Sequence, residues 1–265
     1  MRQFNWTSGS SKNHSEQEWY TQMDAGNLAF ERGFFLAAIR NYRKAMNIAQ
    51  ESDGSDKFRS CTSLKIAKCY LKVGLLNEAE SYFKDVLFID NNSIHTHGEE
   101  LAIDMSEMAM LYLKMGRLPA AEDLLIRSVQ ILEHLSPQSK PFLAKALKNL
   151  GIVYCQSGQL CEAETCLSRA ICMCSGFKNE ERLYAMILAA MASLALANGQ
   201  LAHATELVQE SIQKLEVATG GEHPDLAKIL ELGATVMARQ GLYDEGQSFK
   251  LRADSIRKHV RNLDS

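Results

Sequence analysis

The sequence shows no marked excess of charge, few prolines and no apolar run long enough to span a bilayer. Its 29 Lys and Arg residues nearly balance 32 Asp and Glu residues, so that the formal net charge is -3 and the pI is about 6.2. Without a basic excess nucleic acid is not the expected partner, because cationic side chains drive phosphate binding. An apolar fraction of 46% also excludes wholesale disorder.

The longest stretch without Asp, Glu, Lys or Arg is residues 183–205, and it is too short in its apolar part to cross a membrane. That part ends at Ala197 and has the length of a buried core helix. Residues 1–18 are polar and contain no apolar core of the kind that directs secretion. Seven cysteines without a C-x-x-C pair fit a reducing compartment better than a disulfide framework. We therefore expect a cytoplasmic protein that does not insert into membranes.

Motifs for catalysis and for cofactor binding are also missing. The sequence has no G-x-x-x-x-G-K-[S/T] phosphate loop, and Gly220-Gly221 is predicted to follow a helix rather than a strand. No Ser or Cys stands in a nucleophile elbow, and no paired Asp or His arrangement suggests hydrolysis. We expect a protein that is not an enzyme and that uses no cofactor.

What the sequence does contain is an internal repeat. The residue seven positions before the repeat glycine is Gly or Ala in all six units, and so is the residue five positions after it. Two such columns exclude a chance pattern, and a fixed period of this length is typical of repeat architectures. The repeat glycines, spaced by 41 or 42 residues, are Gly33, Gly74, Gly116, Gly158, Gly199 and Gly241.

Each unit is predicted to form two helices joined by a turn. Apolar residues recur at steps of three and four on both sides of the glycine, as at Leu147, Leu150 and Tyr154 before Gly158. The glycine ends the first helix, because a residue without a side chain adopts the left-handed conformation at little cost. The small columns allow the two helices to approach closely.

The four prolines agree with this division. Pro119 falls at the first turn of a second helix, where proline is tolerated, and Pro137, Pro141 and Pro224 fall between units. None of them interrupts a predicted helix interior, where proline would remove a hydrogen-bond donor. The pattern therefore predicts an all-α fold of twelve helices in six pairs.

The units resemble those of the tetratricopeptide repeat family. Leu147-Lys-Asn-Leu-Gly-Ile-Val-Tyr154, followed by Gly158-Gln-Leu-Cys-Glu-Ala163, carries the resemblance. The usual unit of that family has about 34 residues, whereas a unit of 41 or 42 is similar to the kinesin light chain and nephrocystin type, as is the connecting segment Gly220-Gly-Glu-His-Pro-Asp-Leu-Ala227. The resemblance covers about residues 19–260. It implies a right-handed superhelical solenoid of six helix-turn-helix repeats, with the first helices lining a concave groove.

The expected organisation is one repeat domain over residues 19–265 after a polar, disordered lead at 1–18. The predicted units lie near residues 19–59, 60–101, 102–143, 144–184, 185–226 and 227–265. In the last unit Lys250 replaces a large apolar residue and Gly233 replaces a core aliphatic one. We expect this unit to be a looser cap, because a terminal repeat needs a polar outer face.

A basic lane along the predicted groove is the candidate ligand surface. Lys65, Lys68 and Lys72 stand at steps of three and four, which places them on one face of the first helix of their unit. Inward positions of the neighbouring units extend the lane. The predicted peptide-binding residues are Asn27, Lys65, Lys68, Lys72, Met110, Lys114, Lys145, Lys148, Asn149 and Ile152.

This lane suits a peptide that is acidic, or both acidic and apolar. Asp24 and Glu107 share the inner positions and weaken the positive potential, while Leu64, Met110 and Ile152 offer apolar contacts. The alternative interpretation is that the lysines form an ordinary solvated helix face. In that case the apolar side chains pack against neighbouring helices.

Five cysteines lie close together in the fourth unit, and two histidines lie in the connection before the third unit. The cysteine spacings place the thiols on different helix faces, which favours small apolar packing over a metal site or a redox sensor. His95 and His97 lie in a predicted connection and are interpreted as a loop pair without function. The five cysteines are Cys155, Cys161, Cys166, Cys172 and Cys174.

Two hypotheses for function follow. The first is a noncatalytic adaptor or scaffold that binds a peptide or helix of a partner protein in the concave groove. The alternative is a structural assembly component that acts by self-association or edge docking through the terminal repeat. Leu242, Phe249 and Ile256 motivate the alternative, because they form an apolar strip that no seventh repeat covers.

Overall fold

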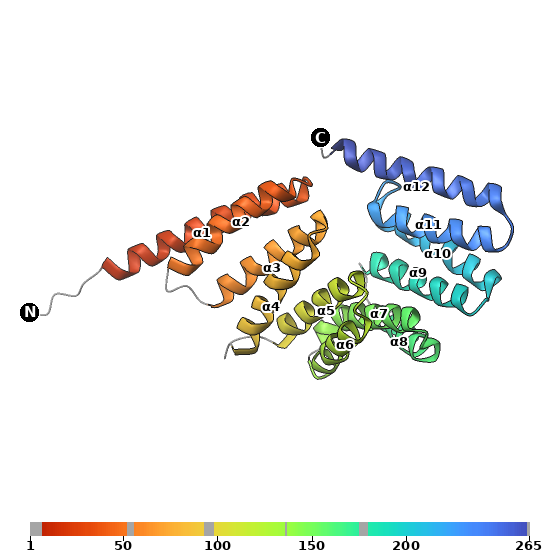
Figure 1. Cartoon of the computed structure of the whole chain (residues 1–265), viewed down its shortest axis with the longest axis horizontal. Coiled ribbons are helices and arrows are strands. Elements are labelled where there is room, and N and C mark those ends of the chain that lie inside the picture. The colour runs from red at the N-terminus through yellow and green to blue at the C-terminus, as the bar shows by residue number, and fades with distance from the viewer. Residues whose placement is uncertain (1–6, 52–55, 93–97, 136, 175–179, 264–265) are drawn as a thin grey trace, which may run out of the picture. The chain divides into compact units, whose positions relative to one another are not determined.

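The computed structural model describes residues 7–51, 56–92, 98–135, 137–174 and 180–263 (Figure 1). Within these ranges the regular elements are twelve α-helices and one short 3-10 helix, Pro137–Ser139. The α-helices are α1 (Thr7–Glu31), α2 (Phe35–Glu51), α3 (Asp56–Val73), α4 (Leu76–Asn92), α5 (Gly98–Lys114), α6 (Leu118–Glu133), α7 (Lys140–Ser157), α8 (Leu160–Cys174), α9 (Glu181–Ala197), α10 (Leu201–Thr219), α11 (Pro224–Arg239) and α12 (Tyr243–Leu263). The prediction of an all-α fold built from helix pairs is confirmed.

The chain divides into two compact units. The first is Met1–Met115, with α1 to α5, and the second is Gly116–Ser265, with α6 to α12. In the first unit α1 packs on α2, while α3 packs on both α2 and α4, and α4 packs on α5. In the second unit α7 pairs with α8, α9 with α10, and α11 with α12. This division differs from the single domain expected over residues 19–265, because it separates the third helix pair, α5 and α6.

The turn inside each pair is built on the repeat glycine. The six repeat glycines have φ values between 72° and 88°. These left-handed values strain any residue that carries a Cβ atom. At Gly158 the amide donates to the Cys155 carbonyl at 3.3 Å, and the amide of Gln159 donates to the Tyr154 carbonyl at 2.9 Å. These bonds satisfy the last carbonyls of α7, and the predicted role of the repeat glycine is confirmed.

Small residues of the first helix let a large side chain of the second helix pack tightly. In the first unit the fully buried ring of Tyr42 lies directly against Gly26. The Tyr42 hydroxyl donates to Asn27 Oδ1 at 2.9 Å, so that the polar end of this buried side chain is satisfied. Phe83 is equally buried at the corresponding position of the next pair. Burial of these rings removes a large apolar area from water in each pair.

The core of the second unit continues through successive pairs. One hydrophobic cluster joins α9, α10, α11 and α12 and includes Leu188, Leu207, Leu226 and Ile256. In addition to the contacts within pairs, α9 contacts the first helices on both sides of it, α7 and α11. Each pair therefore buries its apolar faces against its neighbours, as in other stacked repeats.

The beginning of the helical part differs from the prediction. Helix α1 begins at Thr7, so residues 7–18 are helical and not a disordered lead. This stretch has no proline to prevent the Trp19 helix from extending toward the amino terminus. The later predicted units also begin a few residues inside α3, α5, α7, α9 and α11.

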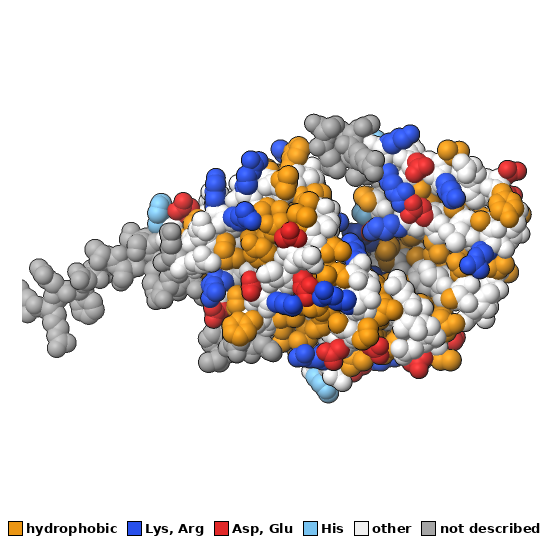
Figure 2. All heavy atoms as spheres, viewed as in Figure 1, with side chains coloured by type: hydrophobic (Ala, Val, Ile, Leu, Met, Phe, Trp, Pro, Cys, Tyr) orange, Lys and Arg blue, Asp and Glu red, His pale blue; other side chains and the backbone are white. Residues whose placement is uncertain are grey.

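The last helix pair is better packed than the sequence predicts. A Cβ atom on Gly233 would lie 3.0 Å from both Phe249 and Val208, so the glycine makes room for the Phe249 ring. Ile256 is only 4% exposed, and Phe249 packs against the same core. Two of the three residues of the apolar strip are thus packed in the core, while Leu242 is 42% exposed, so the strip offers less apolar surface for self-association than the sequence suggests. Lys250 is exposed, and Figure 2 shows charged side chains of both signs along the visible face of α12.

Across the ranges that the structure describes, no helix is both long enough and apolar enough to cross a bilayer. The apolar α9 has 17 residues, which is short of the length that a bilayer span needs.

Candidate functional site

The candidate site lies in the second unit, on the first helices α7, α9 and α11. A cavity of about 270 Å³ opens there, and most of its lining is apolar. Because α9 contacts both α7 and α11, side chains from all three helices reach the same cavity. The lining residues are Ile152, Cys155 and Gln156 of α7, Met186, Ala189, Ala190 and Ser193 of α9, and Lys228, Ile229 and Leu232 of α11.

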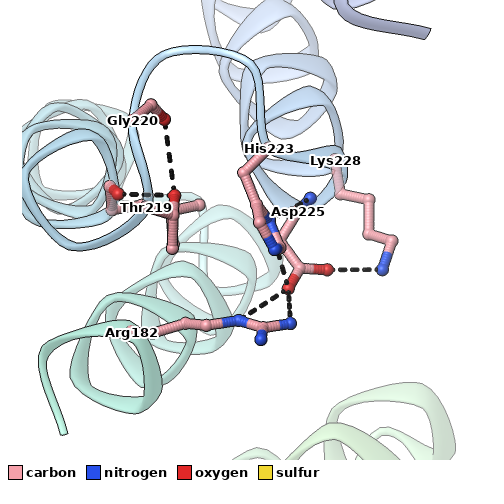
Figure 3. Close-up of polar contacts among 7 residues, drawn as sticks. Arg182, Thr219, Gly220, His223, Asp225 and Lys228 are labelled. Atoms are coloured by element: carbon pink, nitrogen blue, oxygen red, sulfur yellow. Dashed lines mark hydrogen bonds and ion pairs between the residues drawn. The ribbon is translucent and has the colours of Figure 1, made fainter. Parts of the chain in front are cut away.

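The connection before α11 determines where Lys228 lies (Figure 3). Gly220 ends α10 with φ of 81°, which turns the chain out of the helix. His223 then caps α11, because its Nδ1 accepts a hydrogen bond from the Asp225 amide at 3.1 Å. Pro224 occupies the first helical position, where its missing amide proton costs nothing. The first turn of α11 is thereby held in place beside the cavity.

Asp225 joins two cations from two successive first helices, as Figure 3 shows. Its Oδ1 accepts a hydrogen bond from Lys228 Nζ at 2.8 Å, and its Oδ2 accepts from Arg182 Nε at 3.1 Å and Nη2 at 2.5 Å. Burial raises the pKa of this carboxyl, but the hydrogen bonds and charges of Lys228 and Arg182 outweigh it and hold the pKa at about 2. One carboxylate between two cations leaves the cluster with a net positive charge.

The exposure of these groups differs in a way that matters for binding. Asp225 is 8% exposed, whereas the side chains of Lys228 and Arg182 are 65% and 55% exposed. Burial, and after it the charge of Arg182, lowers the pKa of His223, which favours the neutral imidazole that the helix cap requires. The carboxylate therefore positions the two cations, while the cations themselves face solvent.

The cavity offers an apolar surface with one charged side chain beside it. An apolar side chain of a ligand would replace water against Ile152, Met186 and Leu232, and Lys228 stands beside it to attract a carboxylate. Cys155 is the one lining residue with a strong nucleophilic atom, and burial raises the pKa of its thiol. The thiol is protonated at neutral pH and is poorly suited to attack a substrate.

Three of the predicted lysines, all in the first compact unit, share one face of α3. Lys65 and Lys68 are half-buried and Lys72 is exposed, while Ile66 and Ala67 on the opposite side are fully buried. Their spacing thus places them together at the surface of one helix. These lysines belong to the first compact unit, whereas the cavity belongs to the second.

The other predicted residues of the first unit have different surroundings. The Oδ1 atom of Asn27 is engaged by the Tyr42 hydroxyl within its own helix pair. Met110 is half-buried on α5, and Lys114 is exposed in the last turn of that helix. Met110 and Lys114 therefore lie at the surface of α5.

The predicted residues of α7 are divided between surface and core. Ile152 lines the cavity, and Lys145 and Lys148 are half-buried. Asn149 is only 2% exposed, because it lies on the side of α7 that packs against other helices together with Leu150. Its amide therefore does not face a ligand in the groove. The position of Asn149 relative to the repeat glycine Gly158 had predicted an inward-facing side chain.

The sequence interpretation missed the residues that the fifth and sixth repeats contribute to the cavity. Ser193 stands six positions before its repeat glycine, as Ile152 does in its own unit. Met186 and Lys228 stand thirteen positions before theirs, which is the position of the predicted Lys145. Extending these two columns to the last units would have identified them. The role of Asp225 and Arg182 had no comparable signal, because it depends on a contact between distant residues.

The cysteines of the fourth unit do not converge. Cys166 and Cys174 are buried, and burial raises the pKa of both thiols, that of Cys174 to about 11. Cys161 and Cys172 are exposed, so the expectation of core packing holds for only part of the set. In the part of the chain that the structure describes, no group of three or more His, Cys, Asp and Glu residues is arranged to hold a metal ion. His95 and His97 lie outside the described residues.

Stacked helix pairs whose first helices line an apolar cavity with a charged edge define a helical-repeat protein. The family model described as tetratricopeptide repeat matches residues 20–91 and 100–174, more than half of the chain. The chain belongs to the tetratricopeptide repeat family. Proteins of this family generally mediate protein–protein interactions and are generally noncatalytic.

Individual relatives support the kinesin light chain type of repeat. Protein KINESIN LIGHT CHAIN-RELATED 1 of Arabidopsis thaliana is 24% identical over 188 residues, which are 70% of this chain and 31% of that protein. The chain thus spans about a third of the length of this curated relative. The solved kinesin light chain TPR-like repeats of Podospora anserina superpose with a TM-score of 0.62 at 20% identity, over 75% of this chain and 94% of that one.

A second kind of repeat protein shares the fold more closely. A Rap protein solved in complex with competence and sporulation factor superposes with a TM-score of 0.74 at 16% identity. The alignment covers 94% of this chain and 66% of the Rap chain. At such identities these similarities establish the fold alone.

Proposed function

We propose that this chain is a noncatalytic adaptor that binds a segment of a partner protein in the groove lined by its first helices. The observation that carries the proposal is the apolar cavity to which α7, α9 and α11 all contribute. A peptide side chain in this cavity would contact three consecutive repeats at once. Such shared contacts are how a helical groove gains affinity for an amphipathic segment.

The chemistry of the cavity defines the segment that fits it. The apolar lining favours a Leu, Met or aromatic side chain, because burial of such groups drives association. The net positive cluster of Arg182, Asp225 and Lys228 favours an Asp or Glu next to it. We infer that the segment combines acidic and apolar residues. Lys65, Lys68, Lys72 and Lys114 offer a basic surface of their own to acidic peptides in the first compact unit.

The relatives support this proposal at the level of the family. Tetratricopeptide repeats generally mediate protein–protein contacts, and the Rap protein was solved with a bound factor. The absence of catalytic motifs from the sequence agrees with a binding role. A cytoplasmic location remains a prediction from the amino-acid sequence.

The experiment compares the intact chain with variants in which the cavity is filled or its charge reversed. Ser193 is exposed at the cavity, so Ser193→Trp fills the cavity without changing the core. Lys228→Glu reverses the charge beside it. Thr165→Trp is the matched control, because Thr165 is also exposed and makes the same bond to the carbonyl four residues earlier, but lies on α8.

Each protein is applied to an array of peptides that pair Asp or Glu with Leu, Met, Phe or Trp. We expect the wild type and Thr165→Trp to capture a common set of peptides. Ser193→Trp should lose that set, and Lys228→Glu should lose its acidic members. Unchanged capture by Ser193→Trp would exclude the cavity as the binding site.

A further inference from the structure

A second binding surface is indicated by a recurring ion pair between consecutive second helices. Arg169 of α8 pairs with Glu133 of α6, and Arg252 of α12 pairs with Glu216 of α10. In both cases the glutamate lies 17 residues after one repeat glycine, and the arginine lies 11 residues after the next. Two junctions between consecutive second helices, α6–α8 and α10–α12, thus share this pair, whereas the same positions hold Ser175 and Glu210 at α8–α10.

The contact between the first two helix pairs lacks the ion pair and has an acidic residue in place of the arginine. Gln50 of α2 occupies the glutamate position, and Asp85 of α4 occupies the arginine position. A cavity of about 420 Å³ lies where the side chains of an ion pair would otherwise meet. Its lining residues are Met46 and Gln50 of α2, Arg59 and Ser63 of α3, and Ser81, Tyr82, Asp85, Phe88 and Ile89 of α4.

The cations close to this cavity are already engaged. Arg59 pairs with Asp56 at 3.2 Å. Arg43 of α2 donates to the Tyr70 hydroxyl at 2.8 Å, and the Tyr70 ring stacks on the lining residue Tyr82 with 5.7 Å between centroids. Asp85 is different, since within the described ranges its exposed carboxylate has no ion-pair or hydrogen-bond partner.

The remaining lining is partly apolar. Met46 is half-buried and Ile89 is 9% exposed, so they form a fixed apolar surface. Phe88 is 72% exposed, which is unusual for a ring of this size at the edge of a cavity. The cavity therefore offers one uncompensated carboxylate next to aliphatic and aromatic side chains.

We infer that this cavity binds a basic and apolar segment of a partner protein, in which Arg or Lys stands beside an aromatic or aliphatic residue. The ligand cation pairs with Asp85, which stands at the position that Arg169 and Arg252 hold in their own repeats. Its apolar neighbour covers Met46, Phe88 and Ile89. This surface differs in location and in charge preference from the groove of the proposed function.

The test uses the full chain, labelled with 15N, and the probe N-acetyl-Arg-Phe-amide. N-acetyl-Ala-Phe-amide and N-acetyl-Glu-Phe-amide serve as matched ligands. Titrations with the Arg-Phe probe are expected to shift the amide signals of Gln50, Ser63 and Asp85, and the other two dipeptides are expected to bind more weakly. Equal shifts with all three dipeptides, or no shifts with the Arg-Phe probe, would overturn the inference.

Two variants test the role of the carboxylate. Asp85→Asn keeps the shape of an exposed side chain and is expected to weaken Arg-Phe binding by about two- to fivefold, the range for exposed ion pairs. Gln50→Glu combined with Asp85→Arg introduces the Glu–Arg ion pair that joins α6 to α8 and α10 to α12. This double variant is expected to abolish binding. Undiminished binding in either variant would contradict the role of Asp85. Ser193→Trp should leave the Arg-Phe titration unchanged, which separates this result from that of the proposed function.

Discussion

Gly151 of α7 lies so close to Leu167 of α8 that a Cβ atom on the glycine would be 2.7 Å from Leu167 Cγ. Leu167 is fully buried and cannot turn toward solvent. The contact joins the two helices of one repeat. Gly26 and Tyr42 occupy the same two positions in the first repeat. The missing side chain at Gly151 therefore lets Leu167 pack directly against α7.

The first prediction concerns this contact. Gly151→Ala gains helix propensity of up to about 1 kcal/mol, but it overpacks a closed site, which typically costs about 1–3 kcal/mol. We expect a net loss in the free energy of unfolding of about 1 kcal/mol, measured by urea denaturation. In a Leu167→Ala background the clash is absent, and Gly151→Ala should become stabilising. Destabilisation of the same size in both backgrounds would contradict the packing argument.

The second prediction concerns Asp225. Because the folded-state pKa is depressed to about 2, below the ordinary value of 3.8 for an Asp carboxyl, the carboxylate stabilises the fold above pH 4, and this stabilisation is lost as pH falls toward 2. Asp225→Asn should lower the free energy of unfolding by about 1–2 kcal/mol at pH 7, a value reduced for the exposure of Arg182 and Lys228. Urea denaturation from pH 7 to pH 2 measures it. The difference between wild type and variant should shrink below pH 4, and a constant difference would refute the assignment.

The third prediction concerns His223, whose folded-state pKa is lowered chiefly by burial. A lowered pKa means that the unfolded chain binds the proton more readily, so protonation destabilises the fold as pH falls through about 6.5. His223→Asn keeps a capping side chain without an ionisable group. We expect the wild type to lose more stability than this variant between pH 7 and pH 5, by less than about 1 kcal/mol. Identical pH profiles would show that the imidazole does not titrate in this range.

The fourth prediction concerns the lysines of α3. Changing Lys65, Lys68 and Lys72 together to Glu should weaken binding of any acidic peptide found on the array by about tenfold at low salt, because it replaces attraction with repulsion. Fluorescence anisotropy measures the affinity. At about 0.5 M salt the difference should become small, since the Debye length is then only a few ångströms.

A control for this charge reversal is available on the second helix of the preceding pair. Arg32, Arg40 and Lys44 are exposed near or on α2, and their joint change to Glu alters the net charge by the same amount. Equal weakening by both triple variants would mean that only the overall charge matters. The specific role of the α3 face would then be wrong.

The repeat explains why so much of the fold was predictable. A positive φ at Gly158 and the close approach at Gly151 recur in equivalent columns, so that one sequence contains several examples of the same rule. Where the chain departs from its own pattern, prediction was less successful. Gly233 reads as a missing aliphatic residue, but in the structure it accommodates the Phe249 ring. The spacing of one helix cannot show which partner fills the space beside it.

The candidate site was predictable only in part, for the same reason. Helical spacing correctly places Lys65, Lys68 and Lys72 on one face, since that depends on a single helix. It cannot separate Asn149, which is buried, from Ile152, which lines the cavity, because their difference depends on neighbouring helices. Residues in units five and six were missed because the columns were not continued through them.

The amino-acid sequence by itself determined the helix pairs, their turns and the family, because these depend on interactions that recur within each repeat of 41 or 42 residues. Tertiary structure decided which side chains meet between units. Arg182 and Asp225 are 43 residues apart and hold Lys228 beside the cavity only when α9 and α11 are packed. The cavity lined by α2, α3 and α4 likewise depends on the packing of three helices, which brings Gln50 and Asp85 to one lining.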